Sequence, residues 1–332
     1  MAGPGIAHGG TLAGAARCFP EAPRPFIDLS TGINPYSYPL PELSPECFAR
    51  LPEPEDVARL EAIAARAYGV AAPEIVVAAP GTQILISLLP HLLPRGEHVA
   101  VLSPTYGEHA RSWANAGYSV AEIDRLDAAV DADRVVLCNP NNPDGRRFKQ
   151  AELRPLADRL ARRGGILLVD EAFADFEAPG LSMAPGLPHP GIVVLRSFGK
   201  SYGLAGIRLG FLLAAPSIAS LVRRALGPWA VSGPALSAGI LALADDDWRQ
   251  DGMVRLAIDA ARLDALLIGA GFALVGGTSL FRLYEGEGAP AISDHLARRG
   301  ILIRAFAGHP GWLRFGIPGS PLDWARLEGA LR

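Results

Sequence analysis

A lysine without charged neighbours is the first candidate for chemistry in this sequence. Lys200 stands in the segment SFGKSYG, between small and aromatic residues. Burial in such surroundings lowers the pKa of an amine, because desolvation disfavours the charged form, and a neutral amine can form a Schiff base with a carbonyl carbon. A lone lysine in a loop is more often a solvated charge. Lys200 therefore needs support from other residues before it counts as a nucleophile.

Polar residues also follow several apolar runs, at the point where each run ends. Five segments have this pattern: 81–82, 103–106, 139–145, 170–171 and 197–200. In open α/β sheets, ligands bind beyond the carboxyl ends of the strands, so five such ends in succession predict one ligand site. Each segment by itself is weak evidence for a ligand site, since NNPDG is a good turn sequence and Asp170-Glu171 could cap a helix. Their joint occurrence carries the prediction.

Three of these residues, together with Arg208 further along the chain, suit a phosphate group. Gly81 and Thr82 open a predicted helix, whose free N–H groups and positive dipole end favour an anion. Ser197 and Arg208 could complete the site, Arg208 with a bidentate guanidinium.

Three others suit a pyridine ring. Asp170 ends a buried strand and could pair with a protonated ring nitrogen, which keeps the ring an electron sink. Asn142 could hydrogen-bond a ring hydroxyl, and Tyr106 could stack on the ring face. The residues together fit a phosphorylated pyridine aldehyde.

The elements that would position these residues alternate along the chain. Apolar runs without polar alternation, separated by helical patterns, predict a mainly parallel sheet covered by helices on both faces, which is an α/β fold. The expected strands are 74–78, 98–103, 134–139, 165–170 and 192–197.

The last hundred residues differ in pattern and predict a smaller α+β domain. Helices are expected at 216–226, 233–245, 248–270 and 289–299, and short strands at 272–275, 279–284, 301–304 and 312–316. The Gly- and Pro-rich start predicts an extended arm. The expected domains are an arm at 1–40, a large domain at 41–227 and a small domain at 228–332.

Composition and charge argue against several function classes. The 332 residues include 31 basic and 34 acidic ones, a net charge of −3, so no nucleic-acid or anionic membrane partner is expected and small-molecule chemistry is favoured. Three scattered cysteines, Cys18, Cys47 and Cys138, predict neither a disulfide framework nor a metal site. With no signal peptide and no apolar run long enough to span a bilayer, we expect a cytoplasmic protein.

The segments PTY, NPNNPDG, VDEAF and SFGKSYGLAGIRLG closely resemble the class I/II aminotransferase group, over essentially the whole chain. The resemblance implies the fold type I architecture with pyridoxal 5′-phosphate (PLP) as cofactor. It implies that Lys200 carries the cofactor as a Schiff base, Arg208 binds its phosphate, Asp170 faces the pyridine nitrogen and Asn142 the ring hydroxyl. It also implies a homodimer.

Within this group, the N-terminal HGG followed by DLSTGINPYSYP resembles the branch that decarboxylates L-threonine O-3-phosphate in cobalamin biosynthesis. Aminotransferases that act on histidinol phosphate usually have a tyrosine at the position of Phe173, and another at the position of Leu51 that reaches the partner subunit's cofactor. Both tyrosines are replaced here. PLP-dependent decarboxylation of the phosphorylated amino acid is therefore expected, with aminotransferase activity as the alternative and a non-catalytic PLP-binding module as a distant one.

The resemblance also implies the residues that bind substrate. Arg314, in WLRFGIP, matches the arginine that binds the α-carboxylate, and Arg304, in ILIRAF, matches one that serves a phosphate-bearing side chain. The alternative for Arg314 and for Arg304 is a structural ion pair with no role in binding substrate. The remaining candidates for substrate contacts are His8, Gly32, Ile33, Asn34 and Asn142.

Overall fold

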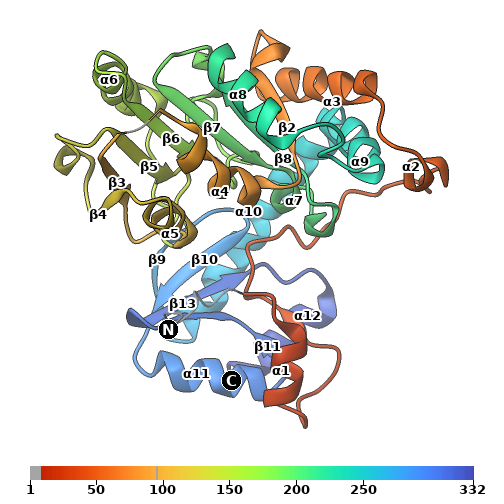
Figure 1. Cartoon of the computed structure of the whole chain (residues 1–332). Coiled ribbons are helices and arrows are strands. Elements are labelled where there is room, and N and C mark those ends of the chain that lie inside the picture. Colours follow the sequence, from red (N-terminus) through yellow and green to blue (C-terminus); the bar gives the residue numbers. More distant parts are fainter. Residues whose placement is uncertain (1–8, 95) are drawn as a thin grey trace. The chain divides into compact units, whose positions relative to one another are not determined.

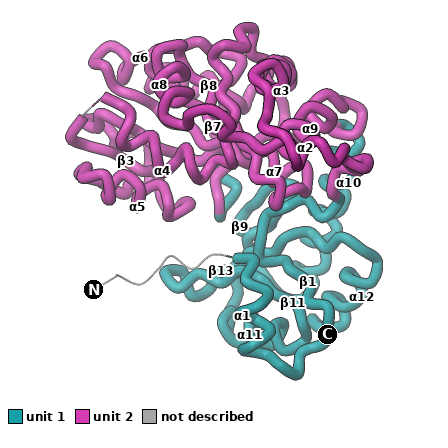
Figure 2. Tube along the Cα trace, turned by 45° about the vertical axis from the view of Figure 1, so that its right-hand side comes forward, with its two compact units in different colours: residues 1–36, 143–146, 250–332 teal, residues 37–142, 147–249 magenta. Residues whose placement is uncertain are grey.

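The computed structural model describes residues 9–94 and 96–332, which divide into two compact units (Figure 2). The large unit comprises residues 37–142 and 147–249; the small unit comprises the described residues up to Tyr36 together with 143–146 and 250–332. The predicted boundary lay near residue 227, whereas residues 228–249 group with the large unit. Local packing explains this difference. In α9 (Gly233–Leu243), a Cβ on Gly239 would come within 2.7 Å of the Leu60 side chain of α3 (Pro54–Ala67).

A mixed sheet forms the centre of the large unit (Figure 1). In the described part of the chain its strand order is β2-β8-β7-β6-β5-β3-β4, with β8 antiparallel to both neighbours and the other adjacent strands parallel. Val135 and Leu137 of β5 enter one hydrophobic cluster and Val136 another, so both faces are buried. The predicted α/β class is confirmed. The strands are β2 Val76–Ala79, β3 His98–Leu102, β4 Ser119–Ile123, β5 Arg134–Cys138, β6 Ile166–Asp170, β7 Ile192–Ser197 and β8 Gly210–Ala214.

Helices connect these strands, and local sequence explains their ends. For example, α3 has Pro54 in its first turn with Glu55 and Asp56 beside it, and Gly69, with φ of +71°, follows its end. None of the described helices is long and apolar enough to cross a membrane. The other helices of this unit are α2 Glu46–Ala49, α4 Thr82–Leu92, α5 Glu108–Asn115, α6 Gln150–Ala161, α7 Phe198–Ser201 and α8 Pro216–Leu226, and α10 (Asp246–Gly269) runs from the large unit into the small one.

The small unit contains an antiparallel sheet in the order β12-β13-β10-β9. Beside it, β1 (Ile27–Asp28) pairs in parallel with β11 (Ile301–Leu302). The other elements are α1 Leu12–Cys18, β9 Ala273–Gly277, β10 Phe281–Glu285, α11 Ala289–Arg298, β12 Arg304–Phe306, β13 His309–Gly316 and α12 Pro321–Ala330.

Three parts of the structure differ from the sequence-based expectation. The predicted extended arm contains helix α1 and strand β1, because LAGAARC is a good helix-forming run and β1 finds its partner far along the chain. Strand β4 lies at the sheet edge with mostly exposed or half-buried side chains, so it lacks the apolar run that marks its neighbours. The antiparallel β8, within the segment LGFLLA, was not assigned.

Candidate active site

The residues predicted to bind a phosphate surround the start of α4. Gly81 has φ of +84°, and a Cβ on it would come within 2.7 Å of Arg208 Nη2. A Cβ on Gly210 would come within 2.7 Å of the Thr82 backbone nitrogen. Ser197 pairs with Gly210 across the sheet. Gly81, Thr82 and the Arg208 guanidinium therefore meet at the N-terminus of α4, with Ser197 opposite Gly210 on the neighbouring strand. This cradle fits a phosphate group.

Lys200 lies in the short helix α7, directly after β7. Its Nζ stands 6.0 Å from the centre of the Phe173 ring, and Phe173 is buried. The backbone is closely packed there, since a Cβ on Gly199 would come within 2.7 Å of Ala205 Cα. Lys200 is half-buried, with the aromatic ring of Phe173 nearby. The lowered pKa of its amine stays a prediction.

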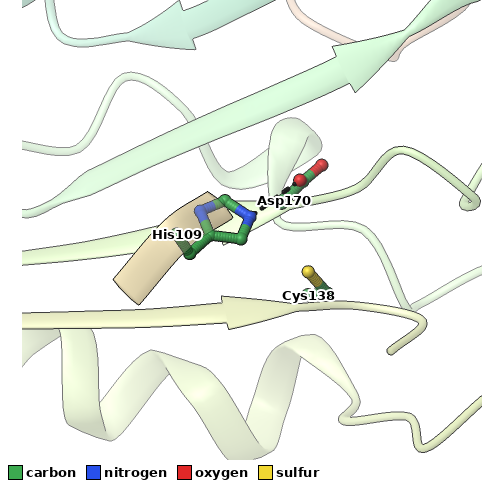
Figure 3. A group of neighbouring side chains, drawn as sticks. All are labelled: His109, Cys138 and Asp170. Carbon is green, nitrogen blue, oxygen red and sulfur yellow. Dashed lines mark hydrogen bonds and ion pairs between the residues drawn. The ribbon is translucent and has the colours of Figure 1, made fainter. Parts of the chain in front are cut away.

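Asp170 is the last residue of β6 and is buried. Its carboxylate has two hydrogen-bond partners. His109 Nε2 lies 2.9 Å from Asp170 Oδ2, and the Ala172 N–H donates to Asp170 Oδ1 at 3.1 Å. Figure 3 shows the His109 ring directed toward Asp170, with Cys138 nearby from β5. Side-chain ligand atoms of these three buried residues lie within 4.8 Å of one another. Although such residues can bind zinc, Nε2 of His109 is already used for Asp170, so we interpret the cluster as a hydrogen-bonded network.

His109 was not among the predicted site residues. Burial disfavours its charged form, but Cys138 and the hydrogen bond to Asp170 outweigh burial and raise the pKa of His109 to about 10. A protonated imidazole at neutral pH keeps a positive charge against the Asp170 carboxylate. The available signal in the sequence was its position, since His109 stands three residues after Tyr106, at the start of the helix expected from about residue 107.

Tyr106 connects this network to the start of α4. Its hydroxyl donates to Gln83 Oε1 at 2.9 Å, and its ring lies edge-on to His109 with 6.0 Å between ring centres. Burial, followed by the charges of Glu108 and Asp170, raises the pKa of Tyr106 to about 12, so the phenol stays neutral. Asn142 is half-buried in the loop after β5. Its role toward a ligand stays a prediction.

In the small unit, Arg304 and Arg314 stand directly opposite each other in the β12–β13 ladder. Side chains of such cross-strand partners share one face of the sheet, and like charges there repel. Burial, then the charge of Arg304, lowers the pKa of Arg314 to about 10, and burial also lowers that of Arg304. Two desolvated guanidinium groups side by side form a surface suited to a ligand with more than one negative charge.

Ser30 links the N-terminal glycines to Arg314. Its carbonyl accepts a hydrogen bond from Arg314 Nη2 at 2.8 Å, and its hydroxyl accepts one from the Gly10 N–H at 2.8 Å. A Cβ on Gly9 would come within 2.5 Å of the Ser30 carbonyl oxygen, so only glycine fits this approach. The Ser30 hydroxyl itself donates to Asp28 Oδ1 at 2.6 Å.

The remaining candidate substrate residues fall into two groups. His8 lies outside the described residues. Gly32 and Asn34 are buried and Ile33 is half-buried in the small unit, and Asn34 Oδ1 accepts a hydrogen bond from the Tyr36 N–H at 2.9 Å. Leu51, which replaces the tyrosine expected in related aminotransferases, is 63% exposed on the large unit.

Comparisons with known proteins show the family to which this chain belongs. The family described as aminotransferase class I and II matches residues 27–326. A Pseudomonas aeruginosa protein named threonine-phosphate decarboxylase is 43% identical, over 98% of this chain and 97% of that protein. A Sinorhizobium protein with the same name is 42% identical, over 98% of this chain and 97% of that protein.

The solved structures include a histidinol-phosphate aminotransferase from Sinorhizobium meliloti in complex with pyridoxal-5′-phosphate. It has a TM-score of 0.84, is 22% identical and covers 99% of this chain and 94% of that chain. At this identity the likeness concerns the fold alone.

Proposed function

Because the chain belongs to the aminotransferase class I and II family, we propose that it is a PLP-dependent threonine-phosphate decarboxylase of cobalamin biosynthesis. The reaction converts L-threonine O-3-phosphate into (R)-1-amino-2-propanol O-2-phosphate and CO2. The observation that carries this proposal is the identity of 43% and 42%, over almost the whole chain, to two relatives of that name.

The cofactor is PLP, and the large unit fits it. We assign the phosphate to the cradle described above, the pyridine nitrogen to Asp170, the ring hydroxyl to Asn142 and the ring face to Tyr106. Lys200 supplies the amine that holds the cofactor. When bound, the cofactor withdraws electrons from the substrate's α-carbon, which allows a bond to that carbon to break. The cradle residues are Gly81, Thr82, Ser197 and Arg208.

The substrate carries a carboxylate and a phosphate, and the two neighbouring arginines of the small unit suit this pair. We assign the carboxylate to Arg314, whose guanidinium is also held by the Ser30 carbonyl. Arg304 is assigned to the phosphate. His8, Gly32, Ile33, Asn34 and Asn142 are the further proposed contacts.

The choice of reaction depends on how the substrate is held. Breakage of the bond between the α-carbon and the carboxylate requires that bond to stand perpendicular to the cofactor ring, whereas transamination requires the C–H bond there. Fixing both ends of the substrate through Arg304 and Arg314 sets this rotation. After CO2 leaves, a proton must be delivered to the α-carbon, and the Lys200 amine is the proposed donor. Phe173 beside Lys200 has no hydroxyl to compete for that proton.

We also propose a cytoplasmic homodimer. Large apolar side chains are exposed on the large unit, including Phe48 at 68% and Leu51 at 63%. Leu51 and Leu241 line one groove between α2, α3 and α9. Exposed apolar surface of this kind is typical of a protein interface, and a second copy of the chain is the occupant that the family resemblance favours.

Product analysis tests the function directly. PLP-loaded protein is incubated with L-threonine O-3-phosphate and no oxo acid, and CO2 and aminopropanol phosphate are measured over time. Many turnovers of both products are expected. Conversion of the cofactor to its pyridoxamine form in a single turnover, without CO2, would instead identify an aminotransferase.

A further inference from the structure

A buried group of charged side chains lies beside the proposed cofactor site. Arg196 donates from Nη1 to Glu171 Oε2 at 2.8 Å and from Nη2 to Asp175 Oδ1. Arg196 is 5% exposed and Glu171 is fully buried. We refer to Arg196, Glu171 and Asp175 as the Arg196 group.

Each end of this group adjoins a residue assigned to the cofactor. Arg196 directly precedes Ser197 on β7, so the two side chains leave the strand on opposite faces. Glu171 directly follows Asp170, and its N–H donates to the Leu195 carbonyl of β7 at 2.9 Å. The Arg196–Glu171 contact therefore joins the ends of β6 and β7 one residue away from Asp170 and Ser197.

Further contacts make the Arg196 group rigid. Glu171 accepts hydrogen bonds from the Ser182 hydroxyl and the Met183 N–H, both at 2.6 Å. The Arg196 guanidinium lies 4.4 Å from the centre of the Tyr68 ring. Although burial disfavours a charged arginine, Asp175 and Glu171 outweigh it and raise the pKa of Arg196 above its usual value, so it stays charged.

Stability alone does not account for such a group. Burying charges costs several kcal/mol of desolvation, and well-packed apolar residues of similar volume are often as stable or more stable. Directional ionic contacts, by contrast, fix one arrangement of the groups they join. Their position suggests what is being fixed, because Asp170, Phe173 and Ser197 all stand within two residues of the Arg196 group.

We infer that Arg196, together with Glu171 and Asp175, is a positioning residue that sets the placement of Asp170 relative to Ser197 and Lys200 for cofactor binding. The inference rests on the proposed function. The Arg196 group acts without touching the cofactor or the substrate, through the strand ends that carry Asp170 and Ser197.

The test compares Arg196→Lys and Glu171→Gln with a matched control, Arg134→Lys. Arg134 is 3% exposed and stands at the opposite end of the same sheet, where it donates to three main-chain carbonyls. Glu171→Gln keeps the shape and some of the hydrogen bonds of the glutamate, so it should fold. The readouts are the PLP dissociation constant, the absorbance maximum of bound PLP and the unfolding midpoint of each apoprotein.

We expect Arg196→Lys and Glu171→Gln to weaken PLP binding about 10- to 100-fold, by analogy with the loss of metal affinity when groups that orient metal ligands are changed. The absorbance maximum should also shift. Arg134→Lys should lower the unfolding midpoint but leave the PLP affinity and the absorbance maximum unchanged. Unchanged PLP affinity and absorbance in both Glu171→Gln and Arg196→Lys would overturn the inference, as would an equal loss of affinity in Arg134→Lys.

Wild-type protein separates this inference from the proposed function. If wild type binds PLP but releases no CO2 from L-threonine O-3-phosphate, the proposed reaction fails while the PLP affinities still decide the positioning role. If wild type decarboxylates and the variants bind PLP as it does, the reaction stands and the positioning role is rejected.

Discussion

Two buried charged groups at opposite ends of the central sheet are held in different ways. At the amino end of β5, Arg134 bonds to the main chain and donates to the carbonyls of Asp133, Gly164 and Pro94. At the carboxyl ends, buried side chains bond to one another, as in Asp170 with His109 and Arg196 with Glu171.

We interpret this difference as a division of roles: contacts at the amino end stabilise the fold, and contacts at the carboxyl end serve the ligand site. Side chain to main chain bonds close loops and satisfy carbonyls that would otherwise be buried without partners. Directional contacts between side chains fix one arrangement of the strand ends that carry them. The carboxyl ends of parallel strands are where open α/β sheets bind ligands, and the contacts of Asp170 with His109 and of Arg196 with Glu171 lie at that end. The predictions below test the separation, from the largest effect to the smallest.

Replacing Lys200 by alanine should give the largest effect. The variant lacks the amine that holds PLP and delivers the proton, so decarboxylation should fall by about 10⁴-fold or more. The visible absorbance band of lysine-bound cofactor should disappear, while the unfolding midpoint of the apoprotein changes little because Lys200 is only half-buried. A surviving band would remove Lys200 from the chemistry.

Arg304→Ala should separate substrate binding from cofactor binding at the sheet. Loss of a charge-assisted hydrogen bond, about 1.5–3 kcal/mol, corresponds to an increase in KM for L-threonine O-3-phosphate of about 10- to 100-fold. The PLP dissociation constant should not change. Arg298→Ala is the control, since Arg298 is an exposed arginine of the same unit that pairs with Asp294 within one helix. An unchanged KM for Arg304→Ala would reject its assignment to the phosphate.

Much of this arrangement could be predicted because its signals are local. Gly81, Asp170 and Lys200 each follow an apolar run that forms a buried strand, so their place at one end of the sheet follows from the parallel fold. The strand pattern also indicated the α/β class before any contact was known.

The rest depends on contacts between distant parts of the chain. His109 meets Asp170 across 61 residues, and β1 meets β11 across most of the sequence. Arg304 faces Arg314 only in the register that the β12–β13 ladder adopts, and a shift of one residue would turn their side chains to different faces. The segment IVVLRS predicts only a strand that includes Arg196, because nothing in it reveals the carboxylates that this arginine meets.

His109→Gln tests the network at the carboxyl end through pH. The pKa of His109 is raised from its usual value to about 10, so the folded protein binds this proton more tightly than the unfolded chain does. Its contribution to stability is therefore complete below about pH 6.5 and is lost as the pH rises toward 10. The difference in unfolding free energy between wild-type and His109→Gln apoprotein should shrink over this range. A difference that does not vary with pH would mean that His109 is neutral.

Asp133→Asn should give the smallest effect, confined to the amino end of the sheet. Asp133 Oδ2 accepts hydrogen bonds from the Glu97 and His98 N–H groups, at 2.7 and 3.1 Å, and these donors lower the pKa of Asp133. The contribution of Asp133 to folding stability is present above the pKa of its carboxyl group in the unfolded chain, about 3.9. It is lost as the pH falls through the lower pKa that this group has in the folded protein. Because the site is open to solvent, the cost of the substitution at neutral pH should be about 1 kcal/mol or less. PLP affinity and the rate of CO2 release should equal those of wild type, since the substitution leaves every contact at the carboxyl ends intact; a loss of either would mean that the two ends of the sheet are not separate.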